Sequence, residues 1–264
     1  MNKKGFIIIG IIFVLIVLAI ICSRFISNKE KIDKDYELLQ VSEYTYFPLE
    51  IDEKYGVIKR DGNIVIPAEY DFVQVPNQDK DIFIVVADGK YKAINSNKQE
   101  LYTNFEEVSG VQEVDSSVYN SSILKYKENN KYGLLDFEGN KVTDAEYDEI
   151  SSLQDKYGEI LVKKNDKYGV INIKGIQLVS CKYDYVKGDG FNRDGSYKDG
   201  GYIIGNKTKN GYVYGYVDKN EKEILKMEQE NVYRVTEINS NDVYLVASKN
   251  GRYALYKNKE ILTS

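Results

Sequence analysis

A tyrosine–glycine motif recurs along this chain at intervals near 40 residues, and no other feature limits the possible folds as strongly. In the strongest copies, glycine directly follows the tyrosine and an aliphatic pair comes next. The copies, three strong and three weak, centre on Tyr55, Tyr91, Tyr132, Tyr168, Tyr214 and Tyr253. Successive tyrosines lie 36, 41, 36, 46 and 39 residues apart. Self-similarity at such a period predicts stacked units, because one small unit cannot bury both of its faces alone.

The unit around Tyr168 shows what each copy contains. It has four short apolar runs, which are Ile160–Val162, Tyr168–Ile173, Leu178–Val179 and Tyr183–Val186. Asn165–Asp166 separates the first two runs, and Asn172–Gly175 has the residues of a type I turn. Four short strands joined by tight turns predict a four-stranded antiparallel meander, with the fourth run as the last strand of its own unit.

A second tyrosine lies fifteen residues after the first in the three strong copies, and aspartate follows it each time. These aspartates are Asp71, Asp148 and Asp184. A residue repeated at one position of every unit more often has a structural role than a catalytic one. We therefore expect the three carboxylates to hold turns or strand edges through hydrogen bonds.

The motifs together resemble the WG-repeat family. The resemblance is carried by KYGVI from Lys54, KYGLLD from Lys131, KYGVIN from Lys167 and YGYVD from Tyr214, with YDFV, YDEI and YDYV downstream of the first three. It extends over about residues 45 to 262. The chain contains no tryptophan, so tyrosine takes the tryptophan position in each copy. The resemblance implies a repeat array with a binding or scaffolding role, and it implies no particular activity.

The period and the strand content predict an all-β fold, a six-bladed β-propeller over residues 36–264. Tyr36–Leu39 resembles a fourth strand with no strands before it, whereas the unit around Tyr253 ends before its own fourth strand. We therefore expect Tyr36–Leu39 to complete the last blade and close the ring, which would remove an exposed strand edge. An open solenoid of hairpins is the architectural alternative.

The N-terminal residues 1–26 predict a single transmembrane anchor. Gly5–Cys22 is an uncharged run of 18 residues, and as a helix it would span about 27 Å. A cleaved signal peptide is the alternative, but the run is long and no small-residue cleavage site follows. Residues 27–35 form a charged linker. Basic residues lie on both sides of the run, and we expect the long C-terminal domain to lie outside the cytoplasm.

The composition excludes several kinds of chemistry. The chain has no histidine, so Ser-His-Asp and Cys-His nucleophile pairs are absent. Its two cysteines are Cys22, in the apolar run, and Cys181, which we expect to be a small buried side chain. The acidic and amide residues in the glycine-rich segment 187–200 do not have the spacing of a calcium loop. We therefore predict no catalytic residue, no metal site and no cofactor.

Binding features are less specific. The repeat tyrosines Tyr55, Tyr132 and Tyr168 are expected to pack between units, because glycine beside each one indicates close approach of another backbone or ring. Stacking of a sugar or peptide on them is the alternative. Residues 109–122 and 187–200 are longer and more polar than the other connections, so they are the first places to seek a binding site.

The charge balance bears on the partner. Without Lys3, Lys4 and Arg24, 33 of the 36 basic residues remain against 41 acidic ones, which disfavours nucleic acid. We expect a membrane-anchored, non-enzymatic binding or scaffolding module with a protein or a cell-envelope polysaccharide as its ligand. The alternatives are an extracytoplasmic carbohydrate-active enzyme and a purely structural envelope protein.

Overall fold

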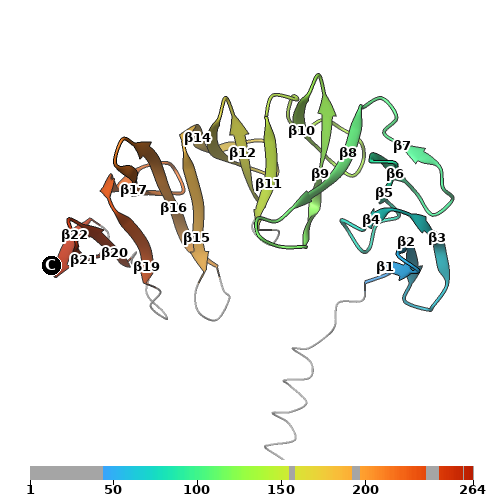
Figure 1. Ribbon diagram of the computed structural model, residues 1–264, viewed down its shortest axis with the longest axis horizontal. Coiled ribbons are helices and arrows are strands. Elements are labelled where there is room, and N and C mark those ends of the chain that lie inside the picture. The colour runs from blue at the N-terminus through green and yellow to red at the C-terminus, as the bar shows by residue number, and fades with distance from the viewer. Residues whose placement is uncertain (1–43, 155–157, 192–196, 236–243, 258, 264) are drawn as a thin grey trace, which may run out of the picture. The chain divides into compact units, whose positions relative to one another are not determined.

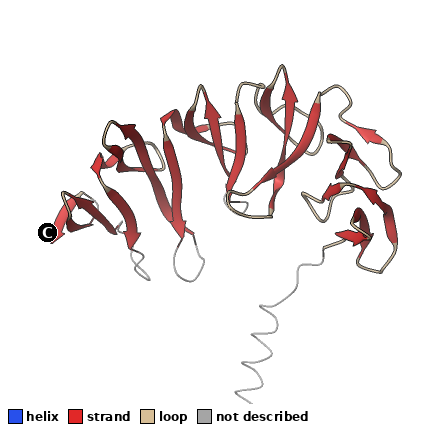
Figure 2. Cartoon of the chain, in the orientation of Figure 1, coloured by secondary structure: helices blue, strands red, loops and turns tan. Residues whose placement is uncertain are grey.

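The computed structural model describes residues 44–154, 158–191, 197–235, 244–257 and 259–263. The chain divides into two compact units, Met1–Tyr44 and Thr45–Ser264, and every strand described below belongs to the second. The regular secondary structure of the described residues is entirely β, which confirms the predicted all-β class (Figure 2). Tyr36–Leu39 and the apolar run Gly5–Cys22 lie outside the described residues. Among the residues described, no helix has the length and apolar character to cross a membrane.

The described strands form six antiparallel sheets, which we number one to six in chain order (Figure 1). Sheet one contains β1 (Tyr46–Ile51), β2 (Lys54–Lys59) and β3 (Ile64–Tyr70). Sheet two contains β4 (Phe72–Gln74), β5 (Phe83–Ala87), β6 (Lys90–Ile94) and β7 (Glu100–Leu101). Sheet three contains β8 (Glu107–Gln112), β9 (Tyr119–Glu128) and β10 (Lys131–Leu135). Sheet four contains β11 (Glu149–Gln154), β12 (Glu159–Lys164), β13 (Lys167–Asn172) and β14 (Gln177–Tyr183). Sheet five contains β15 (Tyr185–Phe191), β16 (Tyr197–Thr208), β17 (Gly211–Asp218) and β18 (Glu223–Gln229), and sheet six contains β19 (Asn231–Val235), β20 (Tyr244–Lys249), β21 (Arg252–Lys257) and β22 (Glu260–Thr263).

The repeat tyrosines occupy equivalent places in these sheets. Tyr55 pairs with Tyr70 across β2 and β3, and Tyr168 pairs with Tyr183 across β13 and β14. In sheet three, the pair Tyr132 and Tyr147 forms an isolated bridge of the same kind. The fifteen-residue spacing in the sequence is therefore the register of one recurring strand pair.

One part of the predicted meander is wrong. The run Tyr183–Val186 was expected to be the fourth strand of its own unit, but Tyr183 ends β14 and Tyr185 begins β15 in the next sheet. Asp184 lies between them, and its backbone N–H donates to the carbonyl oxygen of Gly205, 3.0 Å away in the next sheet. The chain thus leaves sheet four at Tyr183 and is already hydrogen-bonded to sheet five at the following residue. The tyrosine–aspartate pair therefore marks the crossing between two sheets.

An acidic residue stands at each crossing between consecutive sheets in the described part of the chain. We call these residues the junction acids: Asp71, Glu106, Asp148, Asp184 and Glu230. Their carboxylates accept hydrogen bonds of 2.8–2.9 Å from backbone N–H groups in the following sheet, those of Asp88, Asn129, Asn165, Lys207 and Asn250 respectively. Four of these donors have φ near +50°, as the first central residue of a type I′ hairpin turn does. Each junction acid therefore fixes a hairpin of the next sheet.

Three of the junction acids also bind the preceding sheet. Lys54 donates to Asp71 at 2.7 Å and Lys167 donates to Asp184 at 2.6 Å, while Lys131 pairs with Asp148 in the same way. The carboxylate therefore connects a lysine of one sheet to a turn of the next. This confirms the structural role that the sequence predicts for Asp71, Asp148 and Asp184.

The junction acids predict a dependence of stability on acid. The hydrogen bond from lysine, followed by the backbone N–H donor, holds the pKa of Asp71 and of Asp184 below the ordinary aspartate value, and the Lys131 amine has the same effect on the pKa of Asp148. A depressed folded-state pKa stabilises the fold above the unfolded-state pKa of about 3.9, and this contribution is lost as pH falls further. A variant with all three changed to asparagine should therefore unfold at lower urea than the wild type at pH 7, and the difference should shrink near pH 3. Asp166→Asn is the control, because its side chain is 96% exposed. An unchanged difference at the two pH values would contradict this account.

The core consists of separate hydrophobic clusters between consecutive sheets. Among the described residues there are five, one for each neighbouring pair. The cluster between sheets two and three contains Tyr126, and the cluster between sheets four and five contains Val170, both fully buried. Repeat tyrosines pack at the edges of these clusters, as predicted for Tyr55, Tyr132 and Tyr168. Stability therefore depends on sheet-to-sheet contacts, as expected of a repeat protein.

The glycines beside the repeat tyrosines permit close approach of a neighbour, as the sequence indicates. A Cβ atom on Gly169 would lie 2.6 Å from the carbonyl oxygen of Val179 in the next strand. On Gly133 it would lie 2.5 Å from the ring of Tyr126. The absence of a side chain at Gly169 lets the backbone of β14 approach closely, and at Gly133 it leaves room for the aromatic ring of Tyr126.

The six sheets do not close into a ring, so the predicted closed propeller is wrong. No hydrophobic cluster of described residues joins sheet one to sheet six. Ile64 on sheet one remains 52% exposed and Tyr253 on sheet six remains 61% exposed. The physical reason is that each junction fixes only the step between two neighbours, and no described element constrains the sum of the steps to a full turn.

Candidate functional site

The two segments expected to be long loops are mostly strand. In residues 109–122, β8 extends to Gln112 and β9 begins at Tyr119, because these two residues pair with each other. In residues 187–200, β15 and β16 extend to a pair between Phe191 and Tyr197, and residues 192–196 lie outside the described part. Much of each segment therefore lengthens a hairpin, which is β8–β9 in the first case and β15–β16 in the second. The remaining connection between β8 and β9 consists of residues 113–118.

This connection has a defined conformation. The Glu113 N–H donates to the carbonyl oxygen of Val118 at 2.9 Å, and the Gln112 side-chain amide donates to the carbonyl oxygen of Ser116 at 2.6 Å. The Val114 N–H donates to the carbonyl oxygen of Ser152 at 2.9 Å, and this bond ties the connection to the end of β11. The loop is therefore anchored on sheet four, although it belongs to sheet three.

A groove of about 590 Å³ lies beside this loop, and we call it the β8–β9 groove. The loop forms one wall with residues Gln112–Ser117. The other wall is one face of sheet four, with Glu149 and Ser151 from β11, Leu161 and Lys163 from β12, and Tyr168 from β13. Cross-strand pairing places these side chains on the same face, because Glu149 pairs with Lys163 and Lys163 pairs with Tyr168.

The groove is polar with one aromatic ring. The Lys163 amine lies 2.9 Å from a Glu149 carboxylate oxygen and 3.5 Å from an Asp166 carboxylate oxygen. It also lies 5.6 Å from the centroid of the Tyr168 ring. The lysine charge is thus neutralised, and the loop adds Glu113 and Asp115 to the same groove. The groove can donate and accept hydrogen bonds and offers a ring face, and its charge disfavours an anionic ligand.

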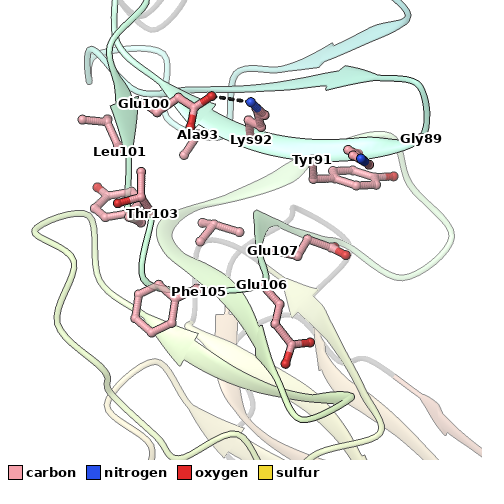
Figure 3. A pocket seen from close by; sticks show the side chains of 13 residues that line it. Gly89, Tyr91, Lys92, Ala93, Glu100, Leu101, Thr103, Phe105, Glu106 and Glu107 are labelled. Carbon is pink, nitrogen blue, oxygen red and sulfur yellow. Dashed lines mark hydrogen bonds and ion pairs between the residues drawn. The ribbon is translucent and has the colours of Figure 1, made fainter.

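A second hollow, of about 320 Å³, lies between sheets two and three (Figure 3). Tyr91 and Glu107 both line it, and an ion pair between Lys92 and Glu100 closes one side. The hollow coincides with a difference between two crossings of the repeat. The residue after the junction acid is Phe72 at the first crossing, where the centroid of its ring lies 5.6 Å from the centroid of the Tyr55 ring. At the second crossing the corresponding residue is Glu107, and Tyr91 is 36% exposed there.

Tyr102 also lines this hollow, and its hydroxyl group makes a structural hydrogen bond. It donates to the carbonyl oxygen of Phe137 at 2.6 Å. Burial, followed by the nearby carboxylates of Glu138 and Asp136, raises the pKa of Tyr102 to about 12. A phenol with this pKa stays protonated at physiological pH, so it acts as a structural donor.

The other residues considered from the sequence do not converge on either hollow. Cys181 is half-buried in β14, and burial raises the pKa of its thiol. Among the described residues no group of acidic or cysteine side chains is arranged to hold a metal ion. The glycine-rich segment 187–200 falls partly outside the described residues. Tyr168 was named from the sequence as a possible stacking ring, but Glu149 and Lys163 were not expected at a site, because only the path of the β8–β9 loop reveals that they face the groove.

The comparisons with known proteins address the repeat. A search of curated protein sequences gave no match. Among solved structures, a eukaryotic initiation factor gives a TM-score of 0.39 at 8% identity, with 83% of this chain and 62% of that chain covered. Dihydro-heme d1 dehydrogenase NirN in complex with DHE gives 0.34 at 13%, with 84% and 54% covered, so this chain spans less than two thirds of either. The N-terminal domain of Nup159 gives 0.31 at 10%, with 82% and 72% covered.

The family comparison agrees with the repeat seen in both sequence and structure. The family model described as WG containing repeat matches residues 55–91 and 132–168. Each match begins at a repeat tyrosine and ends at the next one, so it spans one full step from sheet to sheet. Residues 55–91 and 132–168 of this chain therefore each match the WG containing repeat, with tyrosine in place of the tryptophan.

Proposed function

We propose that this protein is a non-enzymatic binding module whose ligand site is the β8–β9 groove. The observation that carries the proposal is the anchored loop Gln112–Ser117, which forms one wall of a groove against a face of sheet four. Loops held on a rigid β scaffold are where binding residues are commonly found. The repeat array supplies the scaffold, and the groove combines a loop of sheet three with one face of sheet four.

The chemistry of the groove favours a polysaccharide as the ligand. Ser117 and Ser151 add hydroxyl groups to the lining, and Tyr168 adds a ring on which the apolar face of a sugar can stack. A neutral or cationic polymer suits the acidic side chains, whereas nucleic acid does not. In this proposal the N-terminal run Gly5–Cys22 anchors the protein in a membrane, with the repeat domain exposed to the cell envelope.

A retention experiment tests the proposal. The full-length protein in detergent is passed over immobilised neutral and amine-bearing polysaccharides from cell envelopes. Val114→Asp should reduce retention at least tenfold, because Val114 is a 42% exposed apolar side chain of the groove loop. Ile176→Asp is the matched control, since Ile176 is 57% exposed and lies outside the groove.

Each outcome of this experiment distinguishes the candidate functions. Retention that is lost in Val114→Asp and kept in Ile176→Asp supports the proposed site. Shortening of the retained polymer would instead indicate a carbohydrate-active enzyme. Equal retention of the two variants would place binding elsewhere, and no retention of the wild type would favour a protein ligand or a purely structural role.

A further inference from the structure

We propose that the outward face of sheet six docks on the opposite face of sheet one in a second copy of this protein. The docking would repeat, between two chains, the contact that already joins neighbouring sheets within one chain. We call the face that each sheet presents to its successor the forward face, and the one that it presents to its predecessor the reverse face.

The forward face of sheet six carries the same residues as a buried forward face. In sheet four, this face includes Tyr168 and Val170, and sheet five covers it so that Val170 is 0% exposed. Tyr253 and Leu255 occupy the same positions in sheet six. Tyr253 is 61% exposed there, and the neighbouring apolar side chains Leu262, Tyr233 and Val235 are 50%, 47% and 39% exposed.

The reverse face of sheet one is the complementary surface. In sheet five the reverse face packs on sheet four through Tyr202 and Ile204, which are 1% and 4% exposed. Tyr202 pairs with Val217 across two strands of sheet five, and Phe47 pairs with Ile58 at the equivalent position of sheet one. Phe47 therefore lies on the reverse face of sheet one. Ile64 and Ile51 extend the apolar character of sheet one and are 52% and 46% exposed. Both terminal faces thus carry apolar side chains that the other sheets bury.

A second copy is the occupant that these faces fit best. Each face is built to contact another sheet of the same repeat, and pairs of this kind already associate at every step within the described chain. The two faces differ from each other, so the association is head to tail and does not close a twofold dimer. Contiguous exposed apolar side chains on a sheet also mark an interaction surface. The expected product is a row of copies that lengthens with concentration.

Complementation of two blocked variants tests the proposal. Tyr253→Arg blocks the forward face and Ile64→Arg blocks the reverse face, and both sites are more than half exposed, so the fold should tolerate arginine. The full-length protein in detergent is measured by sedimentation at up to roughly 100 µM, above the micromolar constants found for weak interfaces. The wild type should form dimers and longer species, and each blocked variant alone should stay monomeric. An equimolar mixture of the two should form dimers and nothing longer, because each chain keeps one free face.

Controls make the result decisive. Ile176→Arg changes a 57% exposed apolar residue away from both terminal faces and should assemble as the wild type does. Leu262→Arg and Ile51→Arg form a second complementary pair should either first variant fail to fold. A monomeric wild type, a mixture that stays monomeric, or blocked variants that assemble alone would each overturn the proposal. The last of these results would assign association to the N-terminal segment or to another surface.

Discussion

Replacing Tyr126 with alanine is expected to lower the free energy of unfolding by about 3–5 kcal/mol. Tyr126 is fully buried between sheets two and three, and the centroid of its ring lies 4.5 Å from the centroid of the Phe105 ring. The ring also fills the space that the missing side chain of Gly133 leaves open. Its hydroxyl donates to the carbonyl oxygen of Thr143 at 2.9 Å. Alanine would remove the ring from one sheet interface and leave a cavity that the neighbouring strands cannot fill.

Two further variants separate the causes of this loss. Tyr126→Phe keeps the ring and removes one hydrogen bond, so it should cost only about 1 kcal/mol. Tyr253→Ala truncates an exposed tyrosine on the uncovered face of sheet six, and its effect should stay within about 0.5 kcal/mol. The measurement is urea unfolding followed by circular dichroism. Similar losses for Tyr126→Ala and Tyr253→Ala would contradict the assignment of the core to sheet interfaces.

Gly169→Ala is expected to destabilise the fold by about 2–3 kcal/mol. The new Cβ atom would lie 2.6 Å from the Val179 carbonyl oxygen and 2.8 Å from the Cys181 backbone nitrogen. Both neighbours are backbone atoms of β14, so relief requires that two paired strands separate. The loss should appear as a lower midpoint in thermal unfolding.

Gly188→Ala is the matched control for this substitution. Gly188 also lies in a strand, but the atom nearest to its new Cβ is Cδ1 of Leu153, at an ordinary contact distance of 3.6 Å. Its effect should stay within about 0.5 kcal/mol, or slightly stabilise the strand, because alanine loses less backbone entropy than glycine. If both glycines tolerate alanine equally, the close approach of β13 and β14 is not a constraint on the sequence.

The repeat and its register could be predicted from the sequence because they depend on short-range patterns. The fifteen-residue distance from Tyr55 to Tyr70 is the register of one strand pair, and Gly169 marks the close contact in another. The structural role of Asp148 followed from its repetition. These features are local, since each involves one sheet or one crossing to the next.

The features that were wrong or missed depend on longer-range geometry. The run Tyr183–Val186 contains a crossing between sheets, and apolar periodicity alone does not distinguish a strand from a crossing. Ring closure depends on the sum of the steps between sheets, which no motif encodes. The β8–β9 groove combines a loop of sheet three with a face of sheet four, so Tyr168 could be assigned to it only once the path of the loop was known.

Site-resolved amide hydrogen exchange tests the central claim most directly, which is that an acid at each crossing fixes a hairpin of the next sheet. The first central amide of a surface turn normally exchanges quickly, yet the N–H groups of Asp88, Asn129, Asn165 and Asn250 donate to junction acids. We predict that all four are protected at pH 7, and that Asp148→Ala removes the protection of Asn165 while Asp88 and Asn250 keep theirs. Exchange of these four amides at the rate of an unstructured peptide, or equal loss of protection at all of them in Asp148→Ala, would contradict it.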